Sequence, residues 1–458
     1  MRVASPLALW LIGSLVACSA GKSGGDDRPL ADGAADASSG DGGDDGGIVI
    51  PEDSDLDATP PCEGLKCQQV VCDDGGTTSV SGTVFDPAGK VPLYNVIVYV
   101  PNAPLDPFPS GASCDKCGAI ASGSPIVTAL SDSKGKFRLT NVPVGKDIPI
   151  VYQVGKWRRK VILPEVKACT DNAITDRNQS RLPRSQAEGD LPQMALVTGG
   201  CDELECLFRK VGIADSEFTS ASGKGRVHMY KGQGGGTVAG ITDAQPFWSD
   251  VKNLKKYDIT ILSCECSEYP TNKGTDALNA MAGYLNAGGR VFASHYHYYW
   301  FKSGPPDLQS TATWSTSGIA SNPYLIDTTF PKGKAFSDWL MTVGASTTPG
   351  QITLNSVKND VTTVNKATSQ RWVYKDAPES AKYFSFNTPV AKPAESQCGR
   401  AVFSDIHVSN EAGGGAFPGS CTGATDLAAQ EKALEFLFFD LSSCIQKDGE
   451  PPKAPPPK

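Results

Sequence analysis

The sequence predicts a multidomain protein in which a small β-sandwich is followed by an α/β domain with three layers. Between residues 78 and 165, polar and apolar side chains alternate with period two and turn residues separate the runs, as in a sandwich of short strands. Between residues 191 and 445, apolar strands alternate with helical segments, which is typical of a mostly parallel sheet covered on both faces. The chain of 458 residues is long enough for both domains to bury cores.

The N-terminus has the pattern of a bacterial lipoprotein signal peptide in residues 1–18. One basic residue, Arg2, precedes a short apolar stretch that closes with small residues and Cys18. This stretch is too short for a membrane-spanning helix, and its ending predicts cleavage and attachment of lipid to Cys18. Because Ser19 is uncharged, we expect a protein of the cell envelope that is anchored by its lipid in the outer membrane.

The next segment, residues 19–61, is rich in Gly and Asp. Between Asp26 and Asp57 there are 11 acidic residues and one Arg, so this stretch carries −10 and the rest of the chain sums to +2. It has too little apolar surface to form a core, and we expect a disordered tether. The near-neutral remainder argues against nucleic acid as a partner. Residues 62–77 form a Cys-containing linker, and residues 446–458 form a Pro-rich tail.

The predicted sandwich has strands at 79–85, 95–100, 136–139 and 148–152. Its motif residues are Gly82, Val84, Pro92, Val96, Val98, Asp132, Gly135, Phe137, Val142, Pro143 and Gly145. In this order they resemble the carboxypeptidase regulatory-like, transthyretin-like sandwich. The resemblance implies a non-catalytic spacer or binding module.

An insertion with Cys114 and Cys117 interrupts the sandwich pattern. A Cys-x-x-Cys pair can carry redox chemistry, but no thioredoxin-like βαβ pattern surrounds this one. We therefore expect both cysteines to form structural disulfides.

The α/β region has strands expected at 194–198, 226–230, 258–262, 290–294, 383–386 and 400–404, and helices at 203–211, 274–287 and 426–442. In parallel sheets of this kind, ligands bind beyond the carboxyl ends of the strands. The residues that follow the strands are therefore the candidates for function.

Three of the four histidines, His295, His297 and His407, fall just after two of these strands. The surrounding segments, 288–295 and 399–407, resemble the ThuA-like branch of the class I glutamine-amidotransferase-like fold. The resemblance implies a flavodoxin-like three-layer α/β domain and a link to carbohydrate metabolism.

The roles of these histidines stay open. If the strand continues, His295 and His297 face the same way and could share a divalent metal with His407 or Asp405. They could equally act as a general base and its orienting partner, or hydrogen-bond loop carbonyls. Glu265 is a further catalytic or ligand-binding candidate, and the sequence indicates no organic cofactor.

An aromatic-rich insertion accompanies the histidines. Rings with polar tips at the mouth of a pocket suit stacking on sugars, although they could also fill the core beneath a long loop. The residues expected to stack on a ligand are Tyr296, Tyr298, Tyr299, Trp300 and Trp314.

The 13 cysteines other than Cys18 are an odd number, so at least one is free or pairs between chains. The amidotransferase relatives carry a nucleophilic Cys on a strained elbow, for which 263–267 is the candidate here. Leu262 and Cys266 occupy the positions where the elbow needs Gly, which puts the elbow in doubt. Cys206 lies in the helix expected after the first strand and Cys264 follows a strand expected to be central and near it, so we expect these two cysteines to be bridged, or nearly so. The disulfide candidates are Cys114, Cys117, Cys201, Cys206, Cys264, Cys266, Cys398 and Cys421.

Together these patterns favour an exported, lipid-anchored surface protein. We expect its α/β domain to bind a glycan or other cell-envelope material, with the sandwich as spacer. The alternative is a sugar-directed hydrolase or isomerase that uses His295, His297 and His407. Binding is favoured because no carboxylate or Ser accompanies the histidines in a recognised catalytic spacing.

Overall fold

The computed structural model describes residues 62–458 except 118–120, 317, 319, 409–413 and 424. The expected signal peptide, the lipidation site Cys18 and the expected tether lie outside the described residues and remain predictions. The described residues from Cys62 onward belong to one folded unit. In the described part, no helix is long and apolar enough to cross a membrane.

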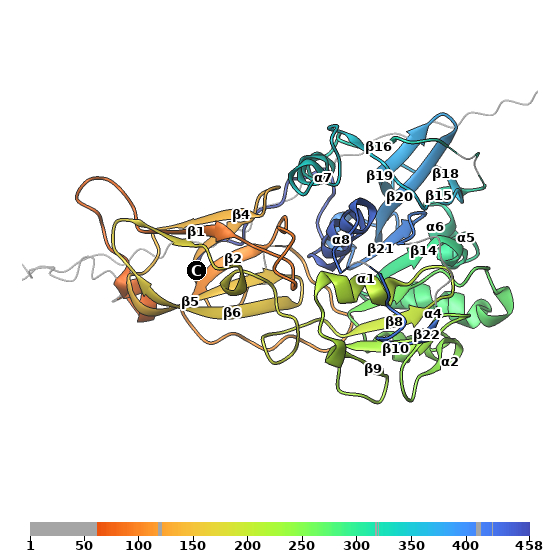
Figure 1. Cartoon of the computed structure of the whole chain (residues 1–458), viewed down its shortest axis with the longest axis horizontal. Coiled ribbons are helices and arrows are strands. Elements are labelled where there is room, and N and C mark those ends of the chain that lie inside the picture. The colour runs from red at the N-terminus through yellow and green to blue at the C-terminus, as the bar shows by residue number, and fades with distance from the viewer. Residues whose placement is uncertain (1–61, 118–120, 317, 319, 409–413, 424) are drawn as a thin grey trace, which may run out of the picture. The chain divides into compact units, whose positions relative to one another are not determined.

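The β-sandwich consists of a three-stranded and a four-stranded sheet (Figure 1). In β4, Phe137 and Leu139 are buried while Lys136 and Arg138 are exposed, the alternation that the sequence predicts. The ring of Phe137 lies 5.9 Å from that of Tyr152 on the other sheet, so the two sheets share one core. The sheets run β4 (Lys136–Thr140), β1 (Ser79–Thr83), β7 (Asp171–Ile174) and β3 (Pro125–Leu130), β2 (Ile97–Pro101), β5 (Gly145–Val154), β6 (Trp157–Val166).

The centre of the larger sheet is five parallel strands in the order β10–β8–β13–β14–β21. Numbered along the chain this is the flavodoxin-like order 2-1-3-4-5. The predicted fold class, a small sandwich followed by a flavodoxin-like α/β domain, is therefore confirmed. The strands are β8 (Met194–Thr198), β10 (Val227–Lys231), β13 (Ile259–Leu262), β14 (Arg290–Ser294) and β21 (Gly399–Ser404).

Beyond β21 the sheet becomes antiparallel, which the expectation of a mostly parallel sheet did not include. About ten residues join β20 to β21, too few for the crossover that parallel strands need. The added strands are β20 (Glu379–Thr388), β19 (Ser369–Asp376), β16 (Tyr324–Ile326) and β17 (Gln351–Ile352), with β12 (Thr242–Asp243) and β9 (Phe218–Ser220) at the other edge. Two short pairs stand apart: β15 (Ala312–Trp314) with β18 (Val361–Val364), and β11 (Gly236–Thr237) with β22 (Gly415–Ala416).

Helices cover both faces of the central strands. Successive strand residues point to opposite sides of the sheet, so each buried strand contributes side chains to two apolar cores. In β8, Met194 and Leu196 join one apolar core, and Ala195 and Val197 join the other. The first core includes residues of α1 (Leu204–Val211), α7 (Pro331–Thr342) and α8 (Ala429–Ser442). The second includes residues of α2 (Ala244–Trp248), α3 (Val251–Leu254), α4 (Thr275–Asn286), α5 (Tyr299–Lys302) and α6 (Pro306–Gln309).

The sandwich and the α/β domain share the first of these cores. Trp157 of β6 makes edge contacts with Phe438 and Phe439 of α8, at 6.5 and 5.7 Å between ring centroids. At Gly155, a Cβ would lie 1.9 Å from the carbonyl oxygen of Ser442, so only Gly permits this approach. The sandwich is therefore packed directly onto α8.

Six disulfides form within the described residues: Cys62–Cys67, Cys72–Cys169, Cys114–Cys398, Cys117–Cys444, Cys201–Cys266 and Cys206–Cys421. Two of them, at Cys114 and Cys117, join the insertion of the sandwich to the α/β domain.

The expected bridge between Cys206 and Cys264 is wrong. Cys206 lies on α1 and pairs with Cys421, and Cys264 is a buried free thiol. The loop after β8 lies beside the loop after β13, because the two strands are neighbours. Cys201, at the start of that loop, therefore reaches Cys266.

We predict that replacing Cys117 and Cys444 together by Ser lowers the free energy of unfolding by about 4 kcal/mol. With Cys114–Cys398 intact, this bridge closes a loop of about 50 residues, and the estimate is the chain entropy that such a loop removes from the unfolded state. Urea denaturation measures the change. Replacing Cys62 and Cys67, which are 5 residues apart, is the matched control and should cost less; an equal loss would contradict the prediction.

A second prediction concerns two carboxyls buried where the sandwich meets α8. Asp86 and Glu435 are both inaccessible to solvent, and burial raises the pKa of each above its usual range, with the Asp86 carboxyl further raising the pKa of Glu435. The folded state then binds more protons than the unfolded state, so stability should fall as the pH rises above about 4.

Asp86→Asn should flatten this decline, because the amide still accepts the backbone N–H bonds of Lys90 and Val91 and carries no charge. Melting temperatures between about pH 4 and about pH 8 test the effect. Asn at exposed Asp73 is the control, and an unchanged pH profile in Asp86→Asn would refute the assignment.

Candidate functional site

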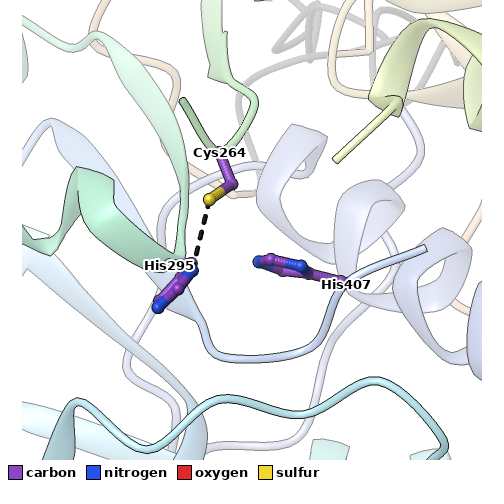
Figure 2. A group of neighbouring side chains, drawn as sticks. All are labelled: Cys264, His295 and His407. Atoms are coloured by element: carbon purple, nitrogen blue, oxygen red, sulfur yellow. Dashed lines mark hydrogen bonds between the residues drawn. The ribbon is translucent and has the colours of Figure 1, made fainter. Parts of the chain in front are cut away.

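Three loops bring Cys264, His295 and His407 together at the carboxyl ends of β13, β14 and β21 (Figure 2). These strands are neighbours in the sheet, so their ends lie side by side. The Sγ of Cys264 is 3.2 Å from Nδ1 of His295, and the rings of His295 and His407 are 5.1 Å apart at their centroids. One donor atom from each residue lies within 4.8 Å of the others.

The backbone is strained where His295 enters this cluster. Strand β14 ends at Ser294 and the short helix η5 (His295–Tyr298) follows at once, with His295 at a φ of 45°. Such values are uncommon outside Gly and concentrate at functional sites. In the 263–267 turn, where the elbow was expected, the positive φ of 69° falls on Cys266, which is held in a disulfide.

The cluster is buried, and burial sets its protonation. Cys264 is fully inaccessible, His407 is 1% exposed and His295 is 8% exposed. Burial raises the pKa of the Cys264 thiol to about 12. Burial, together with the charge of Lys358, lowers the pKa of His295 to about 3 and that of His407 to about 2. All three side chains are therefore neutral at physiological pH.

Two carboxyl groups lie beside the histidines. An Oδ2 atom of Asp360 is 3.3 Å from Nε2 of His295, and the backbone N–H of Asp360 donates to Asp405 Oδ2 at 3.0 Å. Burial raises the pKa of both carboxyls, and the Asp360 charge raises that of Asp405 further. Asp405 was a candidate from sequence, whereas Asp360 lies in a loop before β18 that carries no motif.

Asp202, which the sequence analysis also missed, holds two of the loops in place. Its carboxylate accepts from the Ser294 hydroxyl at 2.6 Å and from the backbone N–H of Val408 at 2.8 Å. Ser294 directly precedes His295, and Val408 directly follows His407. Asp202 follows β8 at the same edge of the sheet. The expectation that functional residues follow the carboxyl ends of the strands could therefore have identified it.

His297 does not join the cluster, because the condition under which it would face the same way as His295, a continuing strand, is not met. The strand ends before His295, so the alternation of a strand does not apply. His297 donates from Nε2 to the carbonyl of Ser263 at 2.9 Å and accepts at Nδ1 from the indole of Trp300 at 2.9 Å. It has no ring nitrogen left for a metal or substrate.

Glu265 belongs to the same internal network. Its carboxylate binds the ammonium of Lys273 at 2.6 Å, with both side chains buried, and accepts from the backbone N–H of Gln233 at 3.0 Å. This pairing explains why a charged residue is tolerated beneath the loop. Glu265 is therefore a partner of Lys273 and does not belong to the Cys264 cluster.

The aromatic insertion divides into core and rim. Trp300 is fully buried and packs on Trp248 at 5.2 Å, so the expectation that it stacks on a ligand is wrong. Tyr296, Tyr298, Tyr299 and Trp314 are half-buried. We call Tyr296, Tyr298 and Trp314 the aromatic rim.

The rim lies next to the cluster. The ring of Tyr296 is 4.0 Å from that of His295, and Tyr298 stacks with Trp314 at 6.3 Å. The Tyr298 hydroxyl donates to the Glu268 carboxylate. Partly exposed aromatic rings and the Glu268 carboxylate therefore meet at one edge of the site.

Comparisons with known proteins identify no family and find only weak structural similarity. No protein-family model and no curated protein matches the sequence. A ThuA-like protein from Bacteroides uniformis is similar over 54% of this chain and 90% of its own, with 12% identity and a TM-score of 0.30. A chain of a type II cohesin-X-dockerin complex from Acetivibrio cellulolyticus is similar over 32% of this chain and 79% of its own, with 14% identity and a TM-score of 0.15. These TM-scores are too low to support a function.

Proposed function

We propose that this chain is an envelope lipoprotein, anchored through Cys18, whose α/β domain binds glycan at the aromatic rim. The observation that carries the proposal is the position of the rim, at the carboxyl ends of parallel strands, where such sheets bind their ligands. Six disulfides indicate a protein of an extracytoplasmic, oxidising compartment.

Glycan suits the chemistry of the rim. Sugar rings present apolar C–H faces that stack on Tyr and Trp, and hydroxyl groups that donate to carboxylates. Tyr296 and Trp314 offer partly exposed rings, and Glu268 offers an acceptor. The rim therefore combines both kinds of contact within one surface.

Binding is favoured over the alternative of a sugar-directed hydrolase or isomerase. That alternative needs His295, His297 and His407 as acid and base groups, and His297 is held by two hydrogen bonds in the core. The lowered pKa values of His295 and His407 make them weak bases at neutral pH. In addition, Cys264 is inaccessible to a substrate.

The anchor gives a direct prediction. Cys18→Ser should leave an unprocessed precursor that no longer takes up labelled fatty acid, because the sulfur that carries the lipid is gone. Cys264→Ser is the matched control and should be labelled as the wild type is. Persistent label in Cys18→Ser would refute the anchor.

The rim gives a second prediction. Tyr296→Ala should weaken binding to glycan about tenfold, the equivalent of about 1.4 kcal/mol, since a stacking ring is lost. The full chain is titrated with purified peptidoglycan fragments and a panel of neutral oligosaccharides. Tyr374→Ala is the matched control. Tyr374 is also half-buried, but its ring centroid lies 3.4 Å from the guanidinium carbon of Arg371 and it is not part of the aromatic rim.

Two results would contradict the proposal. One is that no member of the panel binds the wild-type chain. The other is product formation from a bound glycan that is lost in His295→Gln, which would favour the enzyme.

A further inference from the structure

We propose that Cys264, His295 and His407 form a three-ligand site for a thiophilic transition metal, zinc or copper, beneath the aromatic rim. The site is distinct from the glycan surface and does not depend on it. It also differs from the metal set considered from sequence, because Cys264 replaces His297.

The geometry of the three side chains is close to that of a metal site. Bonds of 2.0–2.3 Å to nitrogen and sulfur place tetrahedral donors about 3.5 Å apart. The Cys264 Sγ and His295 Nδ1 atoms are 3.2 Å apart, and all three donors fall within 4.8 Å. A shift of about 1 Å by His407 would complete the set.

His407 supplies an independent observation. Its Nε2 atom is buried and has no hydrogen-bond partner among the described residues. Figure 2 shows its ring directed toward the other two side chains. A buried imidazole nitrogen without a partner is costly, and a metal ion would satisfy it.

The ligand types select the metal. One thiolate and two imidazoles suit zinc and copper, whereas calcium and magnesium prefer oxygen. Coordination also accounts for the state of Cys264. All twelve other cysteines of the described part are paired, and a thiol that ligates a metal is protected from oxidation.

The surroundings place an acceptor for the outer hydrogen bond that metal-binding histidines usually make. Oδ2 of Asp360 lies 3.3 Å from Nε2 of His295 and has no hydrogen-bond partner among the described residues. A small rotation of the His295 ring on binding a metal through Nδ1 would give it one. Asp202 fixes the residues next to both histidines. The charge of Lys358 acts on Cys264, on both histidines and on Asp202.

The test uses the full chain, purified with a tag that contains no histidine and without reductant. The protein is dialysed separately against Zn²⁺, Cu²⁺ and Co²⁺, and bound metal is measured by elemental mass spectrometry. We expect about one equivalent of zinc or copper, and a thiolate-to-metal charge-transfer band with Co²⁺. Competition with a chelator of known affinity decides between zinc and copper.

Variants separate ligation from structure. Cys264→Ser and His407→Gln should lower metal affinity at least a hundredfold, and Asp360→Ala should lower it about tenfold by removing the carboxyl group beside the His295 ring. His228→Gln is the matched control, because His228 lies on β10 and hydrogen-bonds Tyr257. It should bind as the wild type does.

The proposal fails if wild-type protein binds none of the three metals stoichiometrically. It also fails if Cys264→Ser keeps the full affinity. The Co²⁺ band of the wild type reports thiolate ligation by itself, so the test stands even where a variant does not fold. Glycan binding is measured separately, and its loss or retention does not bear on the metal.

Discussion

Parallel strands can be joined only by crossovers, so all five central strands start at one edge of the sheet and end at the other. This constraint gathers the loops after β13, β14 and β21 at one place. Cys264, His295 and His407 come from three distant parts of the sequence and meet only because of it. The loop after β8 adds Asp202. Its carboxylate accepts hydrogen bonds from Ser294, next to His295, and from Val408, next to His407.

Burial then gives this edge two chemical layers. In the inner layer, desolvation keeps a thiol and two imidazoles neutral, the form in which imidazoles act as donors. The aromatic residues of the outer layer remain partly exposed to water. Tyr296 connects the two, since its ring packs on His295 while it remains partly exposed.

Much of the fold could be predicted from the sequence, because its signals are local. The period of two in 136–139 and the apolar run 194–198 each correspond to a strand. The site was only partly predictable. His295 and His407 could be placed by the rule of strand ends, but the backbone turn after Ser294 that separates His295 from His297 depends on tertiary packing. Asp360 has no local signal, and the partner of Cys206 depends on the position of α1 relative to a loop more than 200 residues later in the chain.

The disulfides Cys114–Cys398 and Cys117–Cys444 have a consequence for how this protein matures. The partners of Cys114 and Cys117 lie 284 and 327 residues further along. In the exported protein that we propose, both thiols would therefore cross the membrane long before Cys398 and Cys444. An oxidant acting in order of emergence would join these two neighbours to each other first. Native pairing therefore calls for a thiol–disulfide isomerase in the receiving compartment. Under this proposal, the yield of correctly paired protein depends on that enzyme more than on the rate of oxidation.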